Sequence, residues 1–251
     1  MIRDFETTLD LMDRAQSDFE SGMPTPEFVE LPSGPVFRFK EKNIYEALIQ
    51  KLARVQSSLR AAYILWQHGY YQEQMMLHRI IDETNEDIMF LVLGVQNEIT
   101  GLHERFLESF WEEEIDESGD ALNSAQKRPM IPRQKIRAFI GNNDGIGNPS
   151  GTIDATRTIY KAYSGFVHGA SPQIMDMFGG DPPHFHTKGM LGTPRVKDGL
   201  LDLWNYMYRS FVSYILFAKI IGAEEHVEKL TEWLNKFEEN QGKKYSKKPS
   251  N

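Results

Sequence analysis

Residues 44–66 read IYEALIQKLARVQSSLRAAYILW, and this stretch decides the fold class. Its apolar side chains recur every three or four residues, the spacing that lines up one face of an α-helix. These apolar positions are Ile44, Leu48, Leu52, Val55, Leu59, Ala62, Tyr63 and Trp66. Gly69 follows as the natural end of the helix. Because such an apolar stripe must be buried against another element, the stretch predicts one member of a helical domain.

The same periodicity returns further along the chain. The segments that carry it are residues 71–115, 152–168, 196–222 and 223–239. Gly94 and Gly101 lie inside the first of these segments, and each costs about 1 kcal/mol relative to Ala in a helix. They either permit close contact between helices or mark a break. Together the segments predict an all-α bundle of about five long helices with almost no strand.

The chain divides into three parts by composition. Residues 1–40 carry a weak, acidic helical pattern followed by clustered prolines, and we expect an irregular N-terminal arm. Residues 41–240 form the predicted helical bundle domain. Within it, residues 171–195 are rich in Gly and Pro and predict a long irregular loop. Residues 241–251 are basic and polar, and we expect a disordered tail.

Charge and composition exclude several classes of protein. The 251 residues carry a formal net charge of −8, which argues against an extended nucleic-acid surface. The absence of cysteine removes disulfides, thiolate catalysis and Cys-based zinc sites. The charged N-terminus shows no secretory pattern, and the longest apolar stretch, residues 211–223, is too short to span a bilayer. We therefore expect a cytoplasmic protein without a membrane anchor. Aromatic helix faces around Trp66, Trp204 and Trp233 suggest a homodimer.

A row of polar side chains stands out in residues 157–170, which read RTIYKAYSGFVHGA. In a helix, Tyr160, Ser164 and His168 fall one turn apart on one face, and Gly169 then ends the helix. Polar groups aligned in this way are either buried and paired or line a site. Arg157 begins the same stretch and is a further candidate ligand-binding residue.

A second polar stripe lies in residues 78–87, which read HRIIDETNED. Arg79 and Glu83 are one turn apart and can form an ion pair, with Asp82 and Glu86 on the same side. One interpretation is a surface ladder of ion pairs, which is common and contributes little stability. The other is that Arg79 and Glu83 face the interior and meet the row of Tyr160, Ser164 and His168.

This pairing of an Arg-x-x-x-Glu helix with a Tyr-x-x-x-Ser-x-x-x-His-Gly helix resembles bacterial helical families of unknown function. These families are related to the HEPN superfamily of helical nucleotide-binding and ribonuclease domains. The resemblance covers roughly residues 40–222. It implies a helical bundle and, for the ribonucleases of the superfamily, a dimer whose facing motifs carry an Arg and a His a few residues apart. Here Arg157 and His168 are separated by ten residues.

His168 therefore has three interpretations. It is a structural tie that donates to Glu83, a general acid or base whose partner Arg79 stabilises a phosphate-like charge, or a metal ligand. Two functional hypotheses follow. One is a binding or scaffold protein in which the polar cluster fixes helix register or holds a small polar ligand, and the Arg–His spacing and acidic charge favour it. The other is a HEPN-like ribonuclease or nucleotide-acting enzyme of a defence or toxin system.

A metal site is the third hypothesis. His184 and His186 stand one residue apart in the Gly/Pro-rich segment, with Asp181 just before them, and two such histidines can chelate a metal. With His168 they would make a site of three histidines. The alternative is that Phe185 anchors the loop on the bundle while both histidines face water. The sequence predicts no other cofactor.

Overall fold

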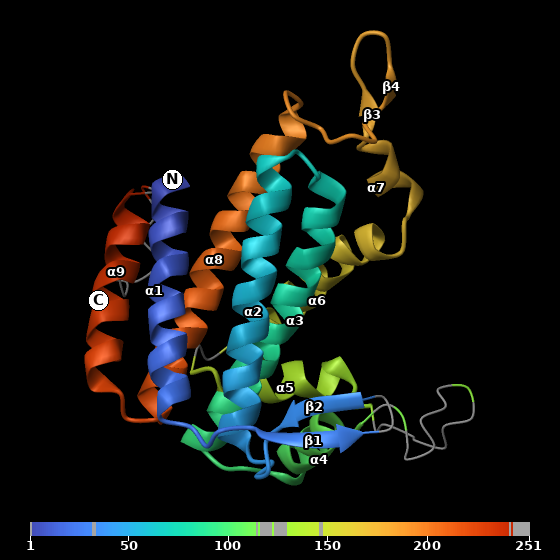
Figure 1. The fold of residues 1–251 in the computed structure, drawn as a ribbon. Helices are drawn as coiled ribbons and strands as arrows, with labels where there is room; N and C mark the ends of the chain where they lie inside the picture. The colour runs from blue at the N-terminus through green and yellow to red at the C-terminus, as the bar shows by residue number, and fades with distance from the viewer. Residues whose placement is uncertain are drawn as a thin grey trace.

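The computed structural model describes residues 2–31, 34–113, 115, 122, 130–145, 148–240 and 242. These residues form an all-α bundle with two small two-stranded sheets (Figure 1), which confirms the predicted fold class. The helices are α1 (Ile2–Ser21), α2 (Ile44–Gln67), α3 (Tyr71–Gln96), α4 (Gly101–Trp111), α5 (Arg133–Asn143), α6 (Pro149–Val167), α7 (Ser171–Met175), α8 (Pro194–Ile220) and α9 (Glu224–Asn240). The strands are β1 (Glu27–Leu31), β2 (Gly34–Arg38), β3 (Phe178–Gly179) and β4 (His184–Phe185).

The central element of the bundle is α3, which packs against α2, α5, α6 and α8. Its apolar side chains Ile81, Ile88 and Leu91 are fully buried. Helices α1 and α9 lie side by side at one edge of the bundle, where both pack against α8 (Figure 1). Because other helices pack on several sides of α3, its polar side chains also come to lie inside the fold.

The N-terminal segment is regular, so the prediction of an irregular arm over residues 1–40 is wrong. Helix α1 buries Phe5, Met12 and Phe19 in the same core as the other helices. Strands β1 and β2 then pair as an antiparallel hairpin. The weak helical pattern of the first residues was the correct signal. Pro24 and Pro26 lie between α1 and β1, and Pro35 lies within β2.

The periodic segment 71–115 is two helices rather than one. Helix α3 ends at Gln96, and α4 begins at Gly101. Gly94 permits a close contact between them, since a Cβ built there would lie 2.6 Å from Nε2 of the buried His103. The two glycines therefore play the two roles considered for them: Gly94 allows the contact, and Gly101 opens the second helix.

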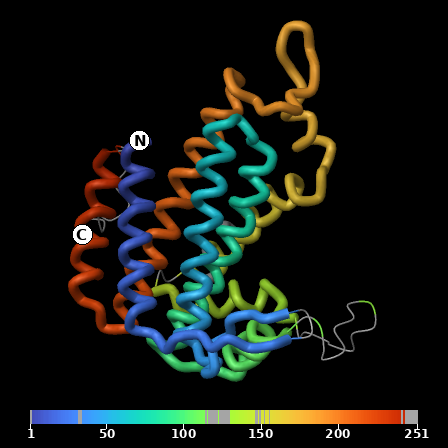
Figure 2. Tube along the Cα trace, viewed as in Figure 1, coloured from blue at the N-terminus to red at the C-terminus, as the bar shows by residue number. Residues whose placement is uncertain are grey.

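The Gly/Pro-rich segment contains α7 and the β3–β4 hairpin, which projects from one end of the bundle (Figures 1 and 2). The chain that follows the hairpin is hydrogen-bonded to the residues just after α2. The N–H of Met190 donates a 2.7 Å hydrogen bond to the carbonyl of Gly69. Gly69 has φ +76°, and a Cβ there would lie 2.7 Å from the backbone nitrogen of Leu191, so only glycine fits.

The three tryptophans that suggested a homodimer are used within the chain. Trp204 is 1% exposed and stacks on Phe237, Trp66 donates to the carbonyl of Val196, and Trp233 donates to Thr8. They therefore give the dimer no support, and it stays a prediction. Among the described helices, none combines the length and apolar character that crossing a bilayer requires. Apart from Gly242, the predicted disordered tail lies outside the described residues.

Candidate functional site

The middle of α3 carries four acidic side chains within six residues. Asp82, Glu86 and Asp87 are 1%, 4% and 7% exposed, and Glu83 is half-buried. A buried carboxylate is stable only when paired. The surface ladder is therefore the wrong interpretation for most of this stripe, because α3 is covered by four other helices.

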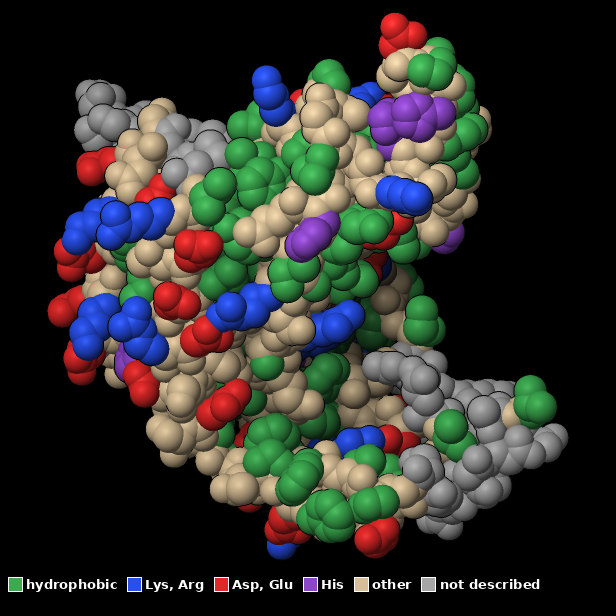
Figure 3. Space-filling model, turned by 45° about the horizontal axis from the view of Figure 1, so that its top comes forward, with side chains coloured by type: hydrophobic (Ala, Val, Ile, Leu, Met, Phe, Trp, Pro, Cys, Tyr) green, Lys and Arg blue, Asp and Glu red, His purple; other side chains and the backbone are tan. Residues whose placement is uncertain are grey.

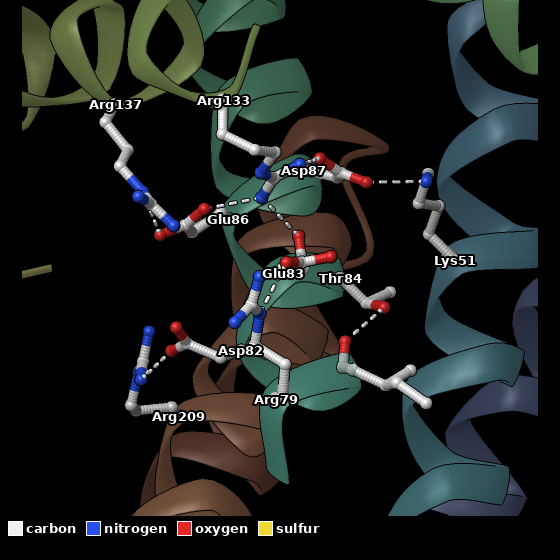
Figure 4. A network of polar contacts seen from close by, with 11 residues as sticks. Lys51, Arg79, Asp82, Glu83, Thr84, Glu86, Asp87, Arg133, Arg137 and Arg209 are labelled. Atoms are coloured by element: carbon white, nitrogen blue, oxygen red, sulfur yellow. Dashed lines mark hydrogen bonds and ion pairs between the residues drawn. The ribbon is translucent and has the colours of Figure 1, made fainter. Parts of the chain in front are cut away.

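Five cationic side chains from four helices pair with these acids (Figure 4). We call the whole set the charge cluster. Its members are Asp82, Glu83, Glu86 and Asp87 with Lys51 of α2, Arg79 of α3, Arg133 and Arg137 of α5, and Arg209 of α8. Cations outnumber acids by five to four in this set.

Glu86 lies at the centre of the charge cluster. Its Oε1 accepts a 2.8 Å hydrogen bond from Nε of Arg137, and its Oε2 pairs with Arg133. Arg133 also pairs with Asp87 and donates to the carbonyl of Glu83 at 2.8 Å. Lys51 reaches Asp87 from the other side at 2.7 Å. These contacts join α2, α3 and α5 through charge-assisted hydrogen bonds.

The electrostatics keep the guanidinium groups charged. Burial lowers the pKa of Arg133, but Asp87 and Glu86 outweigh this effect and raise it above the ordinary value. Burial likewise lowers the pKa of Arg209, while its ion pair with Asp82 raises it, and the net direction is upward. These two guanidinium groups therefore stay charged in the folded protein.

Tyr160 joins the charge cluster from α6. The Cζ atom of Arg79 lies 3.3 Å from the centre of the Tyr160 ring, and that of Arg137 lies 4.3 Å from it. Arg79 also donates from Nη1 to the Tyr160 carbonyl at 3.1 Å and from Nε to Glu83 at 2.6 Å. The structure thus brings together three of the residues that the sequence singled out: Arg79, Glu83 and Tyr160.

The other members of the polar row lie elsewhere. Helices α3 and α6 run antiparallel, since Arg79 meets Tyr160 while Tyr71 meets Phe166. His168 is therefore displaced from Tyr160 by about 12 Å along α6, away from Glu83. It is exposed at the C-cap of α6, where its backbone N–H donates to the carbonyl oxygen of Ser164. The interpretation of His168 as a structural tie to Glu83 is wrong.

Ser164 and Arg157 occupy the turns of α6 on either side of Tyr160. Ser164 is half-buried and Arg157 is exposed. In the part of the chain that the structure describes, no hydrogen bond or ion pair links either side chain to the charge cluster. The row expected on one face of the helix is therefore divided. Tyr160 belongs to the site, whereas a role for Ser164 or Arg157 in ligand binding stays a prediction.

The charge cluster borders a cavity of 270 Å³ between α3, α5, α6 and α8, which we call the α3–α5–α8 pocket. Its lining combines charged, polar and apolar side chains: Asn85, Glu86, Met89, Arg137, Ile140, Asp144, Thr156, Tyr208, Arg209, Val212 and Ser213. A second cavity of 190 Å³ touches the opposite side of the cluster at Lys51, Asp87 and Arg133. A concave, mostly preformed pocket with a few fixed polar groups is the usual form of a small-molecule site.

A separate buried polar group, His78, directly precedes Arg79 of the cluster on α3. His78 is fully buried, and its ring centre lies 4.6 Å from that of Tyr206 and 6.0 Å from that of Tyr163. Burial lowers the pKa of His78 to about 3, so its imidazole is neutral at neutral pH. Burial also raises the pKa values of Tyr163 and of the neighbouring Asp202. No sequence motif had singled out this histidine.

His184 lies in β4 opposite Gly179 of β3, and His186 directly follows β4. The ring centres of His184 and His186 are 4.4 Å apart, and Nδ1 of His184 lies 2.9 Å from the carbonyl oxygen of Pro182. Within the described ranges, no group of three or more His, Asp or Glu side chains is placed to hold a metal ion. The site of three histidines that includes His168 is therefore not formed. Phe185 does not anchor the loop on the bundle either, since it is 45% exposed and packs on Phe178.

Sequence reasoning missed four cations of the charge cluster: Lys51, Arg133, Arg137 and Arg209. Arg133 and Arg137 belong to α5, in the basic stretch of residues 127–137. A usable signal was present, because four acids within one turn and a half of a central helix require cations from its neighbours. Arg133 and Arg137 are one turn apart on one face, beside the buried Ile136.

Comparison of the chain with protein-family models, with curated proteins and with solved structures gave no match. The fold and site therefore define the class of protein by themselves. The described residues form a helical bundle organised around a buried charge cluster, with a small pocket beside that cluster.

Proposed function

We propose that this chain is a binding protein in which the charge cluster fixes the register of four helices and the α3–α5–α8 pocket holds a small molecule. The observation that carries the proposal is that Glu86, Arg137 and Arg209 belong to the cluster and also line the pocket. A ligand bound there contacts side chains whose positions are already set by ion pairs. Such preorganisation reduces the entropy lost on binding.

The pairing pattern supports a register-fixing role. Arg209 of α8, Arg137 of α5 and Lys51 of α2 each meet a different carboxylate of α3. Sliding one helix by a turn would leave a charge buried without a partner, which is strongly unfavourable. The cluster therefore selects one arrangement of the bundle, which a purely apolar core specifies less strictly.

The position of His168 favours binding over catalysis. A general acid or base must lie within hydrogen-bond reach of the reacting group. His168 is exposed at the far end of α6, and the described residues that line the α3–α5–α8 pocket include no histidine. The resemblance to HEPN proteins still offers a ribonuclease or nucleotide-acting enzyme as the alternative. Acidic and basic side chains are interspersed on the face shown in Figure 3, and we give nucleic acid second place as a partner.

The wider proposal concerns setting and assembly. We propose that the protein acts in the cytoplasm, in keeping with the absence of cysteine, and that it is a homodimer, as the HEPN resemblance implies. Sedimentation equilibrium tests the dimer directly. A mass of one chain, 29.0 kDa, across the micromolar range would contradict it.

A pocket-filling variant tests the binding proposal. Val212 lines the α3–α5–α8 pocket and is half-buried, so Val212→Phe fills the cavity without replacing a charged side chain. Val167→Phe places the same change on an exposed position of α6 and serves as the matched control. Ligand-observed NMR with a set of small fragments is expected to find compounds that bind the wild type and Val167→Phe but not Val212→Phe. If no fragment shows this difference, the proposal is wrong.

A further inference from the structure

Two guanidinium groups form one wall of the α3–α5–α8 pocket. Arg137 is 7% exposed and donates from Nε to Glu86, while its Nη2 has no hydrogen-bond partner among the described residues. Arg209 pairs through Nη1 with Asp82, and 36% of its side chain remains exposed. A buried guanidinium with an unused donor, beside a second one that is partly exposed, is an arrangement suited to an anionic group.

The charged side chains of the lining are two cations, Arg137 and Arg209, and two acids, Glu86 and Asp144. Glu86 is already engaged on both oxygens, by Arg137 and Arg133. Asp144 lies at the C-cap of α5, where the helix dipole is also negative. The negative side of the pocket is thus the end of α5, and the positive side is at Arg209 on α8. An anionic group is therefore favoured at the α8 side of the pocket.

The rest of the lining is apolar or already hydrogen-bonded. Met89, Ile140 and Val212 supply aliphatic surface, and Tyr208 adds an aromatic ring. Ser213 donates to Oδ1 of Asn85 at 2.8 Å, and Nδ2 of Asn85 donates to Ser210. With a volume of 270 Å³, the cavity is slightly smaller than most drug-binding pockets. The ligand must therefore have a compact apolar body.

We infer that the α3–α5–α8 pocket binds a small organic acid whose carboxylate or phosphate meets Arg209 and Arg137 while its apolar body contacts Met89, Ile140 and Val212. This inference rests on the proposed function, since it names the class of ligand for the same pocket. The guanidinium fork recognises both kinds of anion through paired hydrogen bonds. The experiment distinguishes the two anions.

The test uses four probes of similar shape: benzoate, phenyl phosphate, neutral benzamide and cationic benzylamine. Isothermal titration calorimetry on the full chain is expected to show at least one anion binding about tenfold or more tightly than benzamide, and benzylamine binding more weakly still. Arg209→Gln is expected to remove this preference and Arg209→Lys to retain part of it. Arg54→Gln, on the exposed side of α2, is the matched control and should bind as the wild type does.

Arg209→Gln leaves the buried Asp82 without its partner and is expected to destabilise the fold. The double variant Asp82→Asn with Arg209→Gln removes the pair together and keeps the test usable. If benzamide or benzylamine binds as tightly as the anions, or if the double variant keeps the anion preference, the inference is wrong while a binding pocket remains. If no probe binds the wild type, the inference also fails, and the fragment screen with Val212→Phe then decides the proposed function separately.

Discussion

Nε of Arg137 on α5 donates a 2.8 Å hydrogen bond to Oε1 of Glu86 on α3, and 8% and 3% of the two side chains are exposed. The two paired residues are 51 positions apart in the chain, and their contact joins α5 to α3. It also forms part of the wall of the α3–α5–α8 pocket. One ion pair thus contributes both to the arrangement of the bundle and to the shape of its candidate binding site.

Removing the shared carboxylate is expected to destabilise the fold strongly. Glu86→Ala leaves Arg133 and Arg137 without that partner, and breaking a buried pair in this way costs about 3–5 kcal/mol. Urea denaturation measures the loss. Glu225→Gln removes the exposed Glu225–Lys229 pair of α9 and serves as a control that should leave the midpoint unchanged. Equal midpoints for both variants would show that the charge cluster does not hold the helices.

The close contact between α3 and α4 predicts that replacing Gly94 by alanine destabilises the protein, whereas replacing Gly101 does not. Gly94→Ala places a Cβ against His103, which is fully buried and stacked on Phe90 with ring centres 4.1 Å apart. Overpacking costs about 1–3 kcal/mol, more than the gain of about 1 kcal/mol from helix propensity. Gly101→Ala meets no atom closer than 3.8 Å and should not destabilise the protein. Thermal melts compare them, and a Gly94→Ala melt at or above the wild type would contradict the contact.

His78 predicts a pH dependence of stability. The unfolded chain protonates this imidazole near pH 6.5, whereas in the folded protein burial lowers the pKa to about 3. Between these values the unfolded state binds more protons, so the free energy of unfolding falls as the pH falls from about 6.5 to 3. Titration of His78 is expected to lower the free energy of unfolding by about 2 kcal/mol at pH 5 relative to pH 7.

His78→Phe keeps an aromatic ring beside Tyr206 and removes the titration. Its free energy of unfolding should change less than that of the wild type between pH 7 and pH 5. Burial also lowers the pKa of His103, so a smaller decline of the same sign remains in the variant. Parallel curves for the two proteins would argue against a neutral, buried His78.

Because His168 is exposed, His168→Ala is expected to melt at nearly the wild-type temperature. Surface substitutions of this kind usually change the free energy of unfolding by about 0.5 kcal/mol or less. RNA incubated with the two proteins tests the alternative function. Background-level cleavage by both is the result expected for a binding protein. Cleavage by the wild type alone would establish the ribonuclease and displace the proposed function.

The loop histidines predict low metal content. His184 and His186 lie close together, but they are not part of a group of three or more His, Asp or Glu side chains in the described part of the chain. Stable protein sites for zinc use three or four protein ligands. Elemental analysis of the protein as purified should therefore give substoichiometric zinc, nickel, iron and manganese. One equivalent of metal that is lost in His184→Ala would support the metal site instead.

Sequence patterns located most helices because the spacing of apolar side chains is a local property. The period in residues 44–66 predicted α2, and the one-turn spacing of Arg79 and Glu83 predicted the ion pair that the structure contains. The first helix was underestimated because its acidic face dilutes the apolar pattern. It contributes to the core by packing against α2 and against α8 and α9, which lie at the other end of the chain.

The site depends on contacts that local spacing does not reveal. Arg209 meets Asp82 across 127 positions, and Arg133 meets Asp87 across 46. His168 shared a helix face with Tyr160 in the sequence pattern, yet the antiparallel packing of α6 on α3 carries it away from Glu83. A helical repeat fixes which residues share a face, but it does not fix which helix that face meets.

The amino-acid sequence by itself determined the all-α architecture, the end of α2 shortly before Gly69 and the placement of four acids on one helix, because helix periodicity and glycine geometry act over a few residues. Tertiary structure alone decided which cations neutralise those acids, that Tyr160 rather than His168 joins them, and that a pocket opens beside Arg209. Electrostatic pairing inside a protein depends on distances between distant segments, and only packing sets those distances.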